Sequence, residues 1–582
     1  MRFVGAALLI AVVVVAAPAS SSTIVVTSGA DVVDGDTSSP AALAANPGAD
    51  GISLREALAA ANRAGHHTVT FADSLRGSTI PIRGAMYVTA EGIAILGLRG
   101  TDGEPDITLS GAQFDERFHH PHRHEPDLLT ILASRFRLEH LRFREVKHRA
   151  VVVQAGPLHG GAATGPQVIR DIRIADNVFD TTGFISGDPY VDAIRVWTDV
   201  LGGAASASIA GVAILRNRMS GFNGNGVIVS ASGDACTIER VVIASNEISN
   251  TAFPIEVNAG NGAGIHVADV RILSNAVSGT QDLPGIFVGH VPATGTKPNS
   301  SEPWPPGAGN RIEDVVISRN RMRSHMQIDA GTSANGRDNV VRDVLISGNA
   351  VFAESGLWLL GGNPASTGNR VDGVRIVSNT VVATRITSFG AIEHPPHNAI
   401  ENVVVSSSIF IGESGPGMNT LRAGTVRDTI TNTPALAGDN GNRDVDPMFV
   451  DPVAGDLRLR PGSPAIDAAA ADAPASDIDC RARAGAPDLG AHEFGAAARW
   501  KLTAEAVGNG AIVVTPEGLE CGPSWSFAPG ATVALQPQAH AGWRFASWLA
   551  DEDCRDATVG MDRDRICVAL FDDVRRRRSV RH

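Results

Sequence analysis

The chain has 582 residues, of which 43% are hydrophobic, 19% charged and 5% aromatic, and it contains 62 glycines and 32 prolines. This apolar content excludes a wholly disordered chain, and glycine without a three-residue period excludes a collagen-like one. The formal net charge of −13 argues against a protein that binds nucleic acid by neutralising phosphates, so we expect no nucleic-acid partner.

The N-terminus has the parts of a secretory signal. Arg2 is followed by an apolar run over residues 3–17 and then by Ala17-Pro18-Ala19. The run is shorter than the ~20 residues that span a bilayer, so it predicts a signal peptide over residues 1–19 rather than a membrane anchor. No later segment has the length and apolarity of a membrane span.

Residues 52–65 predict a capped helix ahead of the first repeated unit. Ser53 and Glu56 have the spacing of a capping box, and Gly65 is a stop signal after residues 57–62. A helix laid over the first coil of a β-structure shields an edge that otherwise invites aggregation. We therefore expect residues 20–67 to form an N-terminal cap.

A repeat of 29 or 30 residues runs through the middle of the chain, with longer insertions in some units. Each unit holds a β-branched run that ends in asparagine or serine, and a second run of the form small-Ile-x-Val such as Ala193-Ile-Arg-Val196. The recurring residues are Asn177, Asn217, Asn246, Asn275, Asn320, Asn349, Asn379 and Ser408. Because neither strand buries its apolar face alone, the units must stack, which predicts a parallel β-solenoid at ~4.8 Å per coil. We interpret the asparagines as turn residues that tolerate left-handed torsions and bond one another along the stack, not as catalytic groups.

This pattern resembles the right-handed parallel β-helix of the pectin-lyase-like superfamily. Residues 52–57, Ile-Ser-Leu-Arg-Glu-Ala, are similar to the CSLREA segment of secreted bacterial β-helix proteins, with isoleucine in place of cysteine. Residues 446–451, 457–467 and 485–494 look like a choice-of-anchor module, and residues 500–572 look like a small β-rich bacterial repeat. The resemblance implies a bacterial protein that is secreted or held at the cell surface.

The expected fold is all-β: a right-handed parallel β-helix with an N-terminal capping helix and a small C-terminal β domain. The expected parts after the cap are the β-helix over 68–430, a closing module over 431–496, a β-repeat domain over 497–573 and a basic tail over 574–582. The five cysteines of an exported chain make disulfides possible. Their pairing stays open, and their odd number leaves at least one outside any intramolecular disulfide.

In this superfamily the substrate groove lies along one strand column, which the second strand of each unit resembles. Side chains alternate along a strand and the flanking Ile and Val point inward, so the outward residues can be assigned coil by coil. They are Val152, Arg195, Ile228, Glu256, Phe287, Asp329, Trp358 and Glu393. The same assignment places Ile194, Ile255, Ile328 and Ile392 in one interior column. Carboxylates, a guanidinium and aromatic rings on one face are the groups that sugar binding uses.

The candidates for catalysis are the carboxylates Asp192, Glu256, Asp329 and Glu393. Glu256 and Asp329 are expected two coils apart, about 10 Å between equivalent backbone points. That is near the upper end of the ~6.5–9.5 Å carboxyl separation of inverting glycosidases. Asp192 precedes Ala193-Ile194 as an aspartate does in polygalacturonase-like chains, but the Asp-Asp pair, Gly-His-Gly and Arg-x-Lys of that group are missing.

The candidates for substrate binding are Arg195, Phe287, Trp358, Lys147 and Arg149. Lys147-His148-Arg149 would give a lyase its base and a cation for a uronate, or would form an exposed turn. The histidines at 119, 120, 122 and 124 are a metal cluster or part of a loop, and we assign no metal site. No cofactor is predicted, and a requirement for Ca²⁺ is left open.

Two functions remain. The first is an exported, monomeric β-helix protein that binds a polysaccharide or cell-envelope glycan, which the missing catalytic signatures and the terminal modules favour. The second is a polysaccharide-degrading enzyme, either hydrolase or lyase, which the fold resemblance and the carboxylates on one face favour. Because β-helices carry out both roles, fold alone does not separate them.

Overall fold

The computed structural model describes residues 22–115, 127–156, 167–181, 191–199, 206–279, 283–291, 307–332, 334–394, 396–412, 424–432, 440–483, 485–507, 510–521, 524–550 and 552–573. The expected signal peptide, the histidine cluster at 119–124 and the basic tail at 574–582 lie outside these described residues.

The N-terminal helix is present as predicted. Helices α1 (Pro40–Ala45) and α2 (Leu54–Ala64) lie in the chain between the paired strands β1 (Thr23–Val26) and β2 (Thr68–Phe71), and a short 3₁₀ helix, η1 (Asp73–Leu75), follows β2. Ser53 and Glu56 form the capping box of α2, and Gly65 ends it with a φ of 70°. Glu56 also accepts hydrogen bonds from the backbone N–H groups of Asp34 and Gly35 at 2.8 and 2.6 Å. Leu54, Leu58 and three alanines of α2, at positions 57, 60 and 61, are buried against the first strands, so the helix covers that end of the stack.

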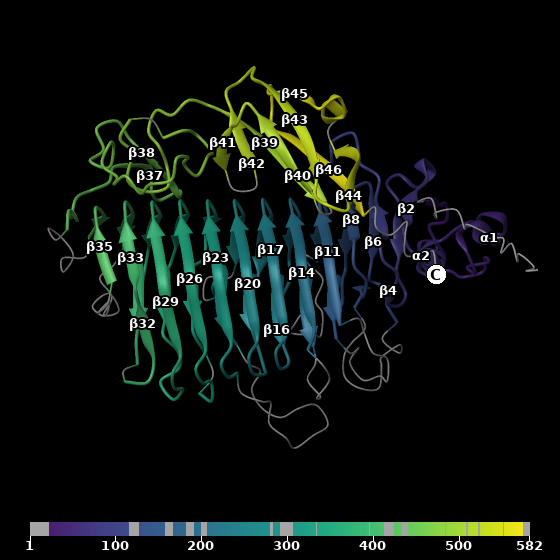
Figure 1. Ribbon diagram of the computed structural model, residues 1–582, viewed down its shortest axis with the longest axis horizontal. Helices are drawn as coiled ribbons and strands as arrows, with labels where there is room; N and C mark the ends of the chain where they lie inside the picture. The colour runs from purple at the N-terminus through teal and green to yellow at the C-terminus, as the bar shows by residue number, and fades with distance from the viewer. Residues whose placement is uncertain are drawn as a thin grey trace, which may run out of the picture.

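Three long sheets of parallel strands form the β-helix, and the coils between the two ends contribute one strand to each sheet (Figure 1). Among the described residues sheet A has fourteen strands. In order of pairing they are β1 (Thr23–Val26), β2 (Thr68–Phe71), β5 (Ala94–Leu96), β8 (Phe136–Glu139), β11 (Val168–Ala175), β14 (Ser208–Leu215), β17 (Thr237–Ala244), β20 (His266–Leu273), β23 (Arg311–Ser318), β26 (Val340–Ser347), β29 (Arg370–Val377), β33 (Val403–Ser406) and β35 (Gly424–Arg427), with β32 (Ala399–Glu401) beside β29.

Sheet B follows sheet A in each coil. Its twelve strands within the described ranges are β3 (Thr79–Pro81), β6 (Ile107–Ser110), β9 (Leu141–Arg144), β12 (Val178–Asp180), β15 (Arg218–Ser220), β18 (Glu247–Thr251), β21 (Ala276–Gly279), β24 (Arg321–Met322), β27 (Ala350–Ala353), β30 (Thr380–Ala383), β34 (Ile409–Ile411) and β36 (Ile430–Thr431). The sequence predicts two strands in each unit and not this third one, because most sheet B strands have only two to four residues.

Sheet C completes the coil. Its ten strands in the described part of the chain are β4 (Met86–Val88), β7 (Leu129–Ile131), β10 (Val151–Ala155), β13 (Ile194–Asp199), β16 (Asn225–Ser232), β19 (Phe253–Ala259), β22 (Ile286–His290), β25 (Met326–Asp329), β28 (Leu357–Leu360) and β31 (Phe389–Ile392). Among them β13, β19 and β22 carry the small-Ile-x-Val runs of the sequence. The all-β parallel β-helix is therefore confirmed.

The repeated asparagines form a buried ladder at the turn from sheet A to sheet B. Asn275 donates its backbone N–H and its side-chain amide to Oδ1 of Asn320, at 2.9 and 3.0 Å, and its amide also donates to the carbonyl of Ile243 at 2.9 Å. The left-handed residue is the one before each ladder position, with φ of 52° to 63°, and not the asparagine itself. A second ladder of Asn310, Asn339, Asn369 and Asn398, at the turn from sheet C to sheet A, was not predicted.

The interior columns of sheet C differ from the predicted one. Ile194 and Ile255 share a column with Val227, Ile286, Met326, Leu357 and Phe389. Ile328 lies in the next inward column, beside Val288 and Leu359, and Ile392 lies on the outward side opposite Leu360. The expectation of one column through Ile194, Ile255, Ile328 and Ile392 was wrong for the last two. The coils nevertheless stack in register and bury one continuous apolar core.

The chain then turns back along the β-helix. Residues 440–496, which we call the closing segment, include the antiparallel pair β37 (Phe449–Asp451) and β38 (Asp456–Leu459). Phe449, Leu457 and Leu459 pack on Val382 and Ile409 of sheet B. The closing segment therefore covers part of the outward face of sheet B.

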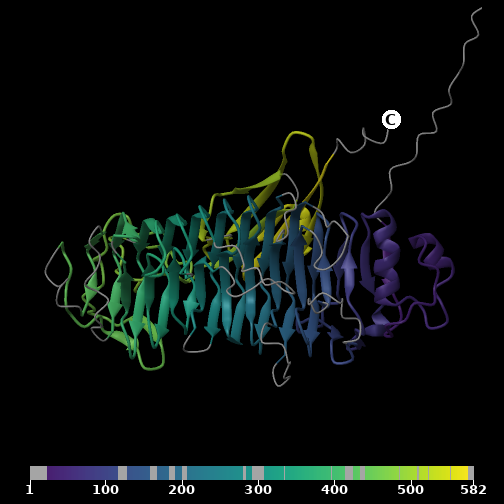
Figure 2. The ribbon, with the colours of Figure 1, turned by 90° about the horizontal axis from the view of Figure 1, so that it is seen from below.

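A β domain follows the closing segment and lies alongside the β-helix rather than beyond its last coil (Figures 1 and 2). Its elements are β39 (Trp500–Val507), β40 (Gly510–Thr515), β41 (Leu519–Cys521), β42 (Ser524–Phe527), β43 (Thr532–Ala539), β44 (Trp543–Ala550), η4 (Glu552–Asp556), β45 (Thr558–Gly560) and β46 (Arg565–Asp573). Arg319, on the A–B turn, donates to Oγ of Ser476 in the closing segment at 2.9 Å.

Four of the five cysteines form disulfides. Cys480–Cys521 joins the closing segment to the β domain, and Cys554–Cys567 lies within that domain, each with Cα atoms 5.5 Å apart. Cys236 is buried inside the β-helix, where its Sγ accepts the N–H of Ala207 at 3.5 Å. Across the described ranges no helix combines the length and apolarity needed to cross a membrane.

Candidate functional site

Two outward columns of sheet C hold most of the residues singled out from the sequence. We call them together the sheet C face. The first column is Tyr87, Thr130, Val152, Arg195, Ile228, Glu256, Phe287, Gln327, Trp358 and Gly390. The second is Gln154, Trp197, Ser230, Asn258, Gly289, Asp329, Leu360 and Ile392.

Two of the predicted outward positions need correction. Asp329 is on this face but in the second column, since Gln327 occupies the first-column position in β25. Glu393 lies just after β31, where Gly390 takes the first-column position, and its Oε1 accepts the backbone N–H of Ile400 at 2.9 Å. Glu393 thus holds a turn in place. The cause of both errors is a strand that begins two or three residues earlier than the spacing of the isoleucines indicates.

Asp192 is the centre of a buried ionic cluster. Its side chain has no exposed surface, and its Oδ2 lies 2.7 Å from Nη2 of Arg195 and 3.5 Å from Nε of Arg149. Arg149 also pairs with Asp127 at 3.2 Å. Burial raises the pKa of Asp127, and the neighbouring Arg149 opposes that rise. Asp192 orients two guanidinium groups and has no surface left for a substrate, so it positions other residues rather than reacting.

Asn225 connects this cluster to Glu256. Its backbone N–H donates to Oδ1 of Asp192 at 2.8 Å, and its side-chain amide donates to Oε2 of Glu256 at 2.7 Å. The amide of Asn258 donates to the other oxygen of Glu256, and Oγ of Ser230 donates to Asn258 at 2.6 Å. Burial raises the pKa of Glu256, and the two amides only partly offset it. The result is a chain of fixed polar groups across β13, β16 and β19.

Asp329 has a different environment. Its side chain is buried and accepts the backbone N–H of Gly331 at 2.8 Å and the amide of Gln327 at 3.2 Å. Burial raises its pKa to about 6. Among the described residues no arginine, lysine or histidine forms an ion pair with it. A carboxyl group of this kind can hold or release a proton close to neutral pH.

The aromatic residues on the sheet C face are not equivalent. The Arg195 guanidinium lies over the ring of Trp197, 5.4 Å from its centroid. Trp358 donates its indole N–H to Oγ of Ser355 at 2.6 Å, and its ring lies so close to Gly390 that a Cβ there would be 2.4 Å from ring carbons. Phe287 is only 5% exposed, so the expected stacking surface at this position is closed.

Lys147 and Arg149 of the basic triplet at 147–149 have separate contacts in the structure. Arg149 belongs to the ionic cluster, whereas Lys147 reaches the carbonyl of Phe114 with its Nζ at 3.2 Å. Sequence reasoning missed Asp127, Asn225, Asn258 and Trp197. A period-two count from Arg195 and Glu256 would have found Trp197 and Asn258 on the same face. Asp127 and Asn225 lie outside that alternation, so no sequence pattern predicts that they reach the sheet C face.

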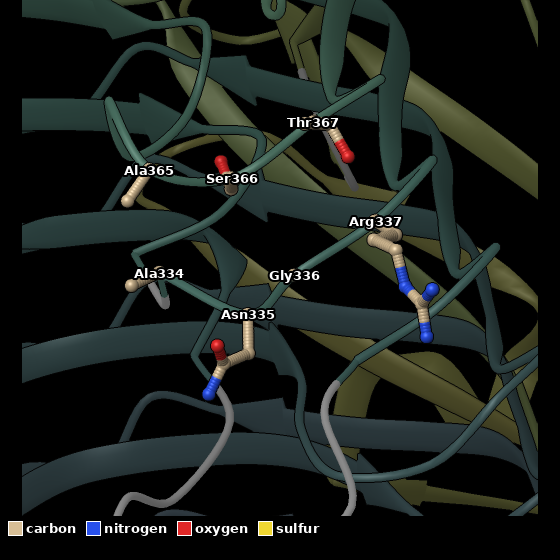
Figure 3. Close-up of a pocket in the computed structure, with 7 residues that line it drawn as sticks. All are labelled: Ala334, Asn335, Gly336, Arg337, Ala365, Ser366 and Thr367. Atoms are coloured by element: carbon tan, nitrogen blue, oxygen red, sulfur yellow. The ribbon is translucent and has the colours of Figure 1, made fainter.

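Outside the sheet C face, one hollow of about 380 Å³ lies at the C–A turns, lined by Ala334–Arg337 and Ala365–Thr367. Figure 3 shows its side chains pointing in different directions, with Arg337 extending away from Ala334 and Ala365. No group of three or more His, Cys, Asp or Glu arranged to hold a metal occurs in the part of the chain that the structure describes.

No protein-family model and no curated protein matches this sequence. Among solved structures the chain is similar to the pectate lyase Pel9A, at 12% identity and a TM-score of 0.31, over 82% of this chain and 97% of that one. It is also similar to a GH136 lacto-N-biosidase from Eubacterium ramulus, at 11% identity and a TM-score of 0.33, over 70% of this chain and 68% of that one. A third similar structure is the Dettilon tailspike protein, at 13% identity and a TM-score of 0.30, over 72% of this chain and 70% of that one. Likenesses this distant concern the fold alone.

Proposed function

We propose that the chain is an exported β-helix protein that binds a polysaccharide or cell-envelope glycan along the sheet C face. The observation that carries this proposal is the chain of fixed polar groups from Asp192 through Asn225 to Glu256, next to the Arg195–Trp197 pair. A sugar presents hydroxyl groups at its edge and an apolar face. Donors and acceptors that are already held in place cost little ordering entropy when a ligand binds.

Export is part of the same proposal. The N-terminal signal pattern favours it, and two disulfides are typical of chains that fold in an oxidising compartment. A location at a bacterial surface is the further part of this proposal, and it is supported by the resemblance of residues 52–57 to CSLREA, of 431–496 to a choice-of-anchor module and of 497–573 to a bacterial β-repeat. Secretion assays with residues 1–19 removed test this part independently of ligand binding.

Binding is tested with a panel of immobilised acidic and neutral polysaccharides. We expect Arg195→Gln to weaken binding of the best ligand about tenfold, or ~1.4 kcal/mol. Arg271→Gln is the matched control, because Arg271 is also ion-paired on an outward face but belongs to sheet A. Equal losses in both variants, or none in either, would contradict the sheet C assignment.

A second candidate function is cleavage of the bound glycan. The raised pKa values of Glu256 and Asp329 favour it, because a protonated carboxyl group can deliver a proton to a glycosidic oxygen while a second, ionised one activates water. Against it, the two Cα atoms are two strands and two residues apart, about 12 Å. This exceeds the ~6.5–9.5 Å that inverting enzymes need unless both side chains lean together. The geometry therefore favours binding over hydrolysis.

Cleavage is tested by incubating the full chain with the same polysaccharides. New reducing ends indicate a hydrolase, and absorbance from an unsaturated uronate indicates a lyase. If either appears, Glu256→Gln and Asp329→Asn should each abolish it. Turnover that survives both substitutions would remove these residues from the mechanism, whereas the absence of products with retained binding supports the first function.

A further inference from the structure

A larger cavity, of about 530 Å³, lies on the opposite side of the coil from the residues discussed above. One wall is the outward face of sheet B at strands β18, β21, β24 and β27, and the other wall is the closing segment between Gly455 and His492. This volume is within the ~300–1,000 Å³ of typical small-ligand sites. At its β27 end the cavity adjoins the apolar contact between the closing segment and sheet B, since Ala350 and Phe352 belong to both.

Small residues on the outward face of sheet B leave room for this cavity. Arg321 follows the ladder residue Asn320 and is the outward residue at the start of β24. Its neighbours in the column are Ala276 and Ala350, whose small side chains leave room on both sides. Arg323, two residues on, lies with its guanidinium 5.8 Å from the ring centroid of Phe352.

Positive charge in the cavity is only partly neutralised. Arg321 pairs with Asp479, and Arg458 pairs with Asp456 at 2.5 Å. Arg323 donates to the carbonyl of Ala454 at 3.0 Å, and no carboxylate among the described residues pairs with it or with Arg481. Four arginines and three carboxylates thus line the cavity, and the guanidinium groups of Arg323 and Arg481 are the two that form no ion pair with a described residue.

The other polar residues define which anion would fit. Glu247, Asp456 and Asp479 also line the cavity, and their carboxylates would repel a compact polyanion such as phosphate. The same carboxylates accept hydrogen bonds from hydroxyl groups. His492 lines the cavity as well, and burial lowers its pKa to about 4, so its ring is neutral near pH 7.

We propose that this cavity is a second binding site, separate from the sheet C face, for a short sugar that carries a carboxylate among its hydroxyl groups. Arg323 and Arg481 bind the carboxylate, with the fork of a guanidinium matching its two oxygens. Glu247 and Asp456 accept hydrogen bonds from the hydroxyl groups. Phe352, already stacked on Arg323, offers its edge to the apolar face of the sugar ring.

Calorimetric titration of the full chain tests the proposal with two probes that differ only in the carboxylate, cellobiouronic acid and cellobiose. We expect the acid to bind at least about tenfold more tightly than cellobiose. Arg323→Gln together with Arg481→Gln should remove this preference, or ~1.4 kcal/mol. Arg63→Gln, at an exposed position near the end of helix α2, is the control and should not change it. Arg195→Gln should leave it intact, which separates this site from the sheet C face.

Equal affinity for the two probes, or an unchanged preference in the double variant, would overturn the proposal. So would inorganic phosphate that competes as well as the acid does. If the double variant fails to fold, modification of the natural chain with phenylglyoxal decides the question. The acid should protect Arg323 and Arg481 but not Arg63, and uniform modification would contradict the assignment.

Discussion

The turn from sheet A to sheet B and the sheet C face belong to the same coils but follow opposite rules. At the turn, coil after coil carries asparagine with the same three hydrogen bonds, two to the asparagine of the next coil and one to a carbonyl of the preceding coil. On the sheet C face neighbouring coils carry Arg195, Ile228, Glu256, Phe287 and Gln327 in one column. A repeated residue supplies the hydrogen bonds that the buried backbone of every coil needs. Different residues along one column bring together side chains that no single coil contains.

The largest effect is expected where the repeat is broken. Asn320→Ala removes the acceptor of both donors of Asn275 and the donor to the carbonyl of Ile272, and it leaves these groups buried. At 1–3 kcal/mol for each unsatisfied group, we expect a loss of about 4 kcal/mol in the free energy of unfolding. Urea unfolding followed by circular dichroism measures it. Arg375→Ala, an exposed change on sheet A, is the control and should stay within about 0.5 kcal/mol. Similar losses in both variants would contradict the role of the ladder.

An intermediate effect is expected on the sheet C face, at Asp329. Its pKa rises from 3.8 to about 6 on folding, so the folded state disfavours the ionised form. Stability is therefore full below pH 4 and falls as the pH rises through 6, by on the order of 3 kcal/mol at pH 8. Asp329→Asn keeps the shape without the charge and should flatten this dependence. Unfolding measured at pH 4 and pH 8 checks it, and an unchanged slope in the variant would show that Asp329 is not the group responsible.

The smallest effect on stability is expected at Asn225, within about 2 kcal/mol, because its backbone bond to Asp192 survives truncation. Asn225→Ala removes an amide that lowers the pKa of Glu256, so that pKa should rise further. Carboxyl titration by NMR measures the shift. Gln327→Ala is the matched control, because it removes an amide from Asp329 and should raise the pKa of that residue instead. If both variants shift Glu256 equally, the two carboxyl groups are not independently held.

The sequence was informative where a residue type repeats or a local rule acts. The α2 cap at Ser53 and Glu56 follows from hydrogen bonds within four residues, and the asparagine ladder follows from a fixed spacing. Both were predictable because the information is local or repeated. The short strands of sheet B were not, since two to four residues carry too little periodic signal.

Register was the harder problem. In β25 both Met326 and Ile328 are apolar and two residues apart, so a period-two pattern accepts either one as the partner of Ile255. Only the pairing of β25 with β22 and β28 decides which of the two residues faces Ile286, and this register puts Asp329 in the second column. The ionic cluster was missed for a related reason. Asp127, Arg149 and Asp192 come from three different coils, and their proximity is a property of the stack.

The most direct test of the glycan-binding face is hydrogen–deuterium exchange of the full chain with and without the best-binding oligosaccharide. The account predicts slower exchange in β13, β16 and β19, whose outward residues include Arg195, Trp197, Glu256 and Asn258, and unchanged exchange in β14, β17 and β20 of sheet A. Protection confined to sheet A, or bound ligand without any protection in sheet C, would contradict it.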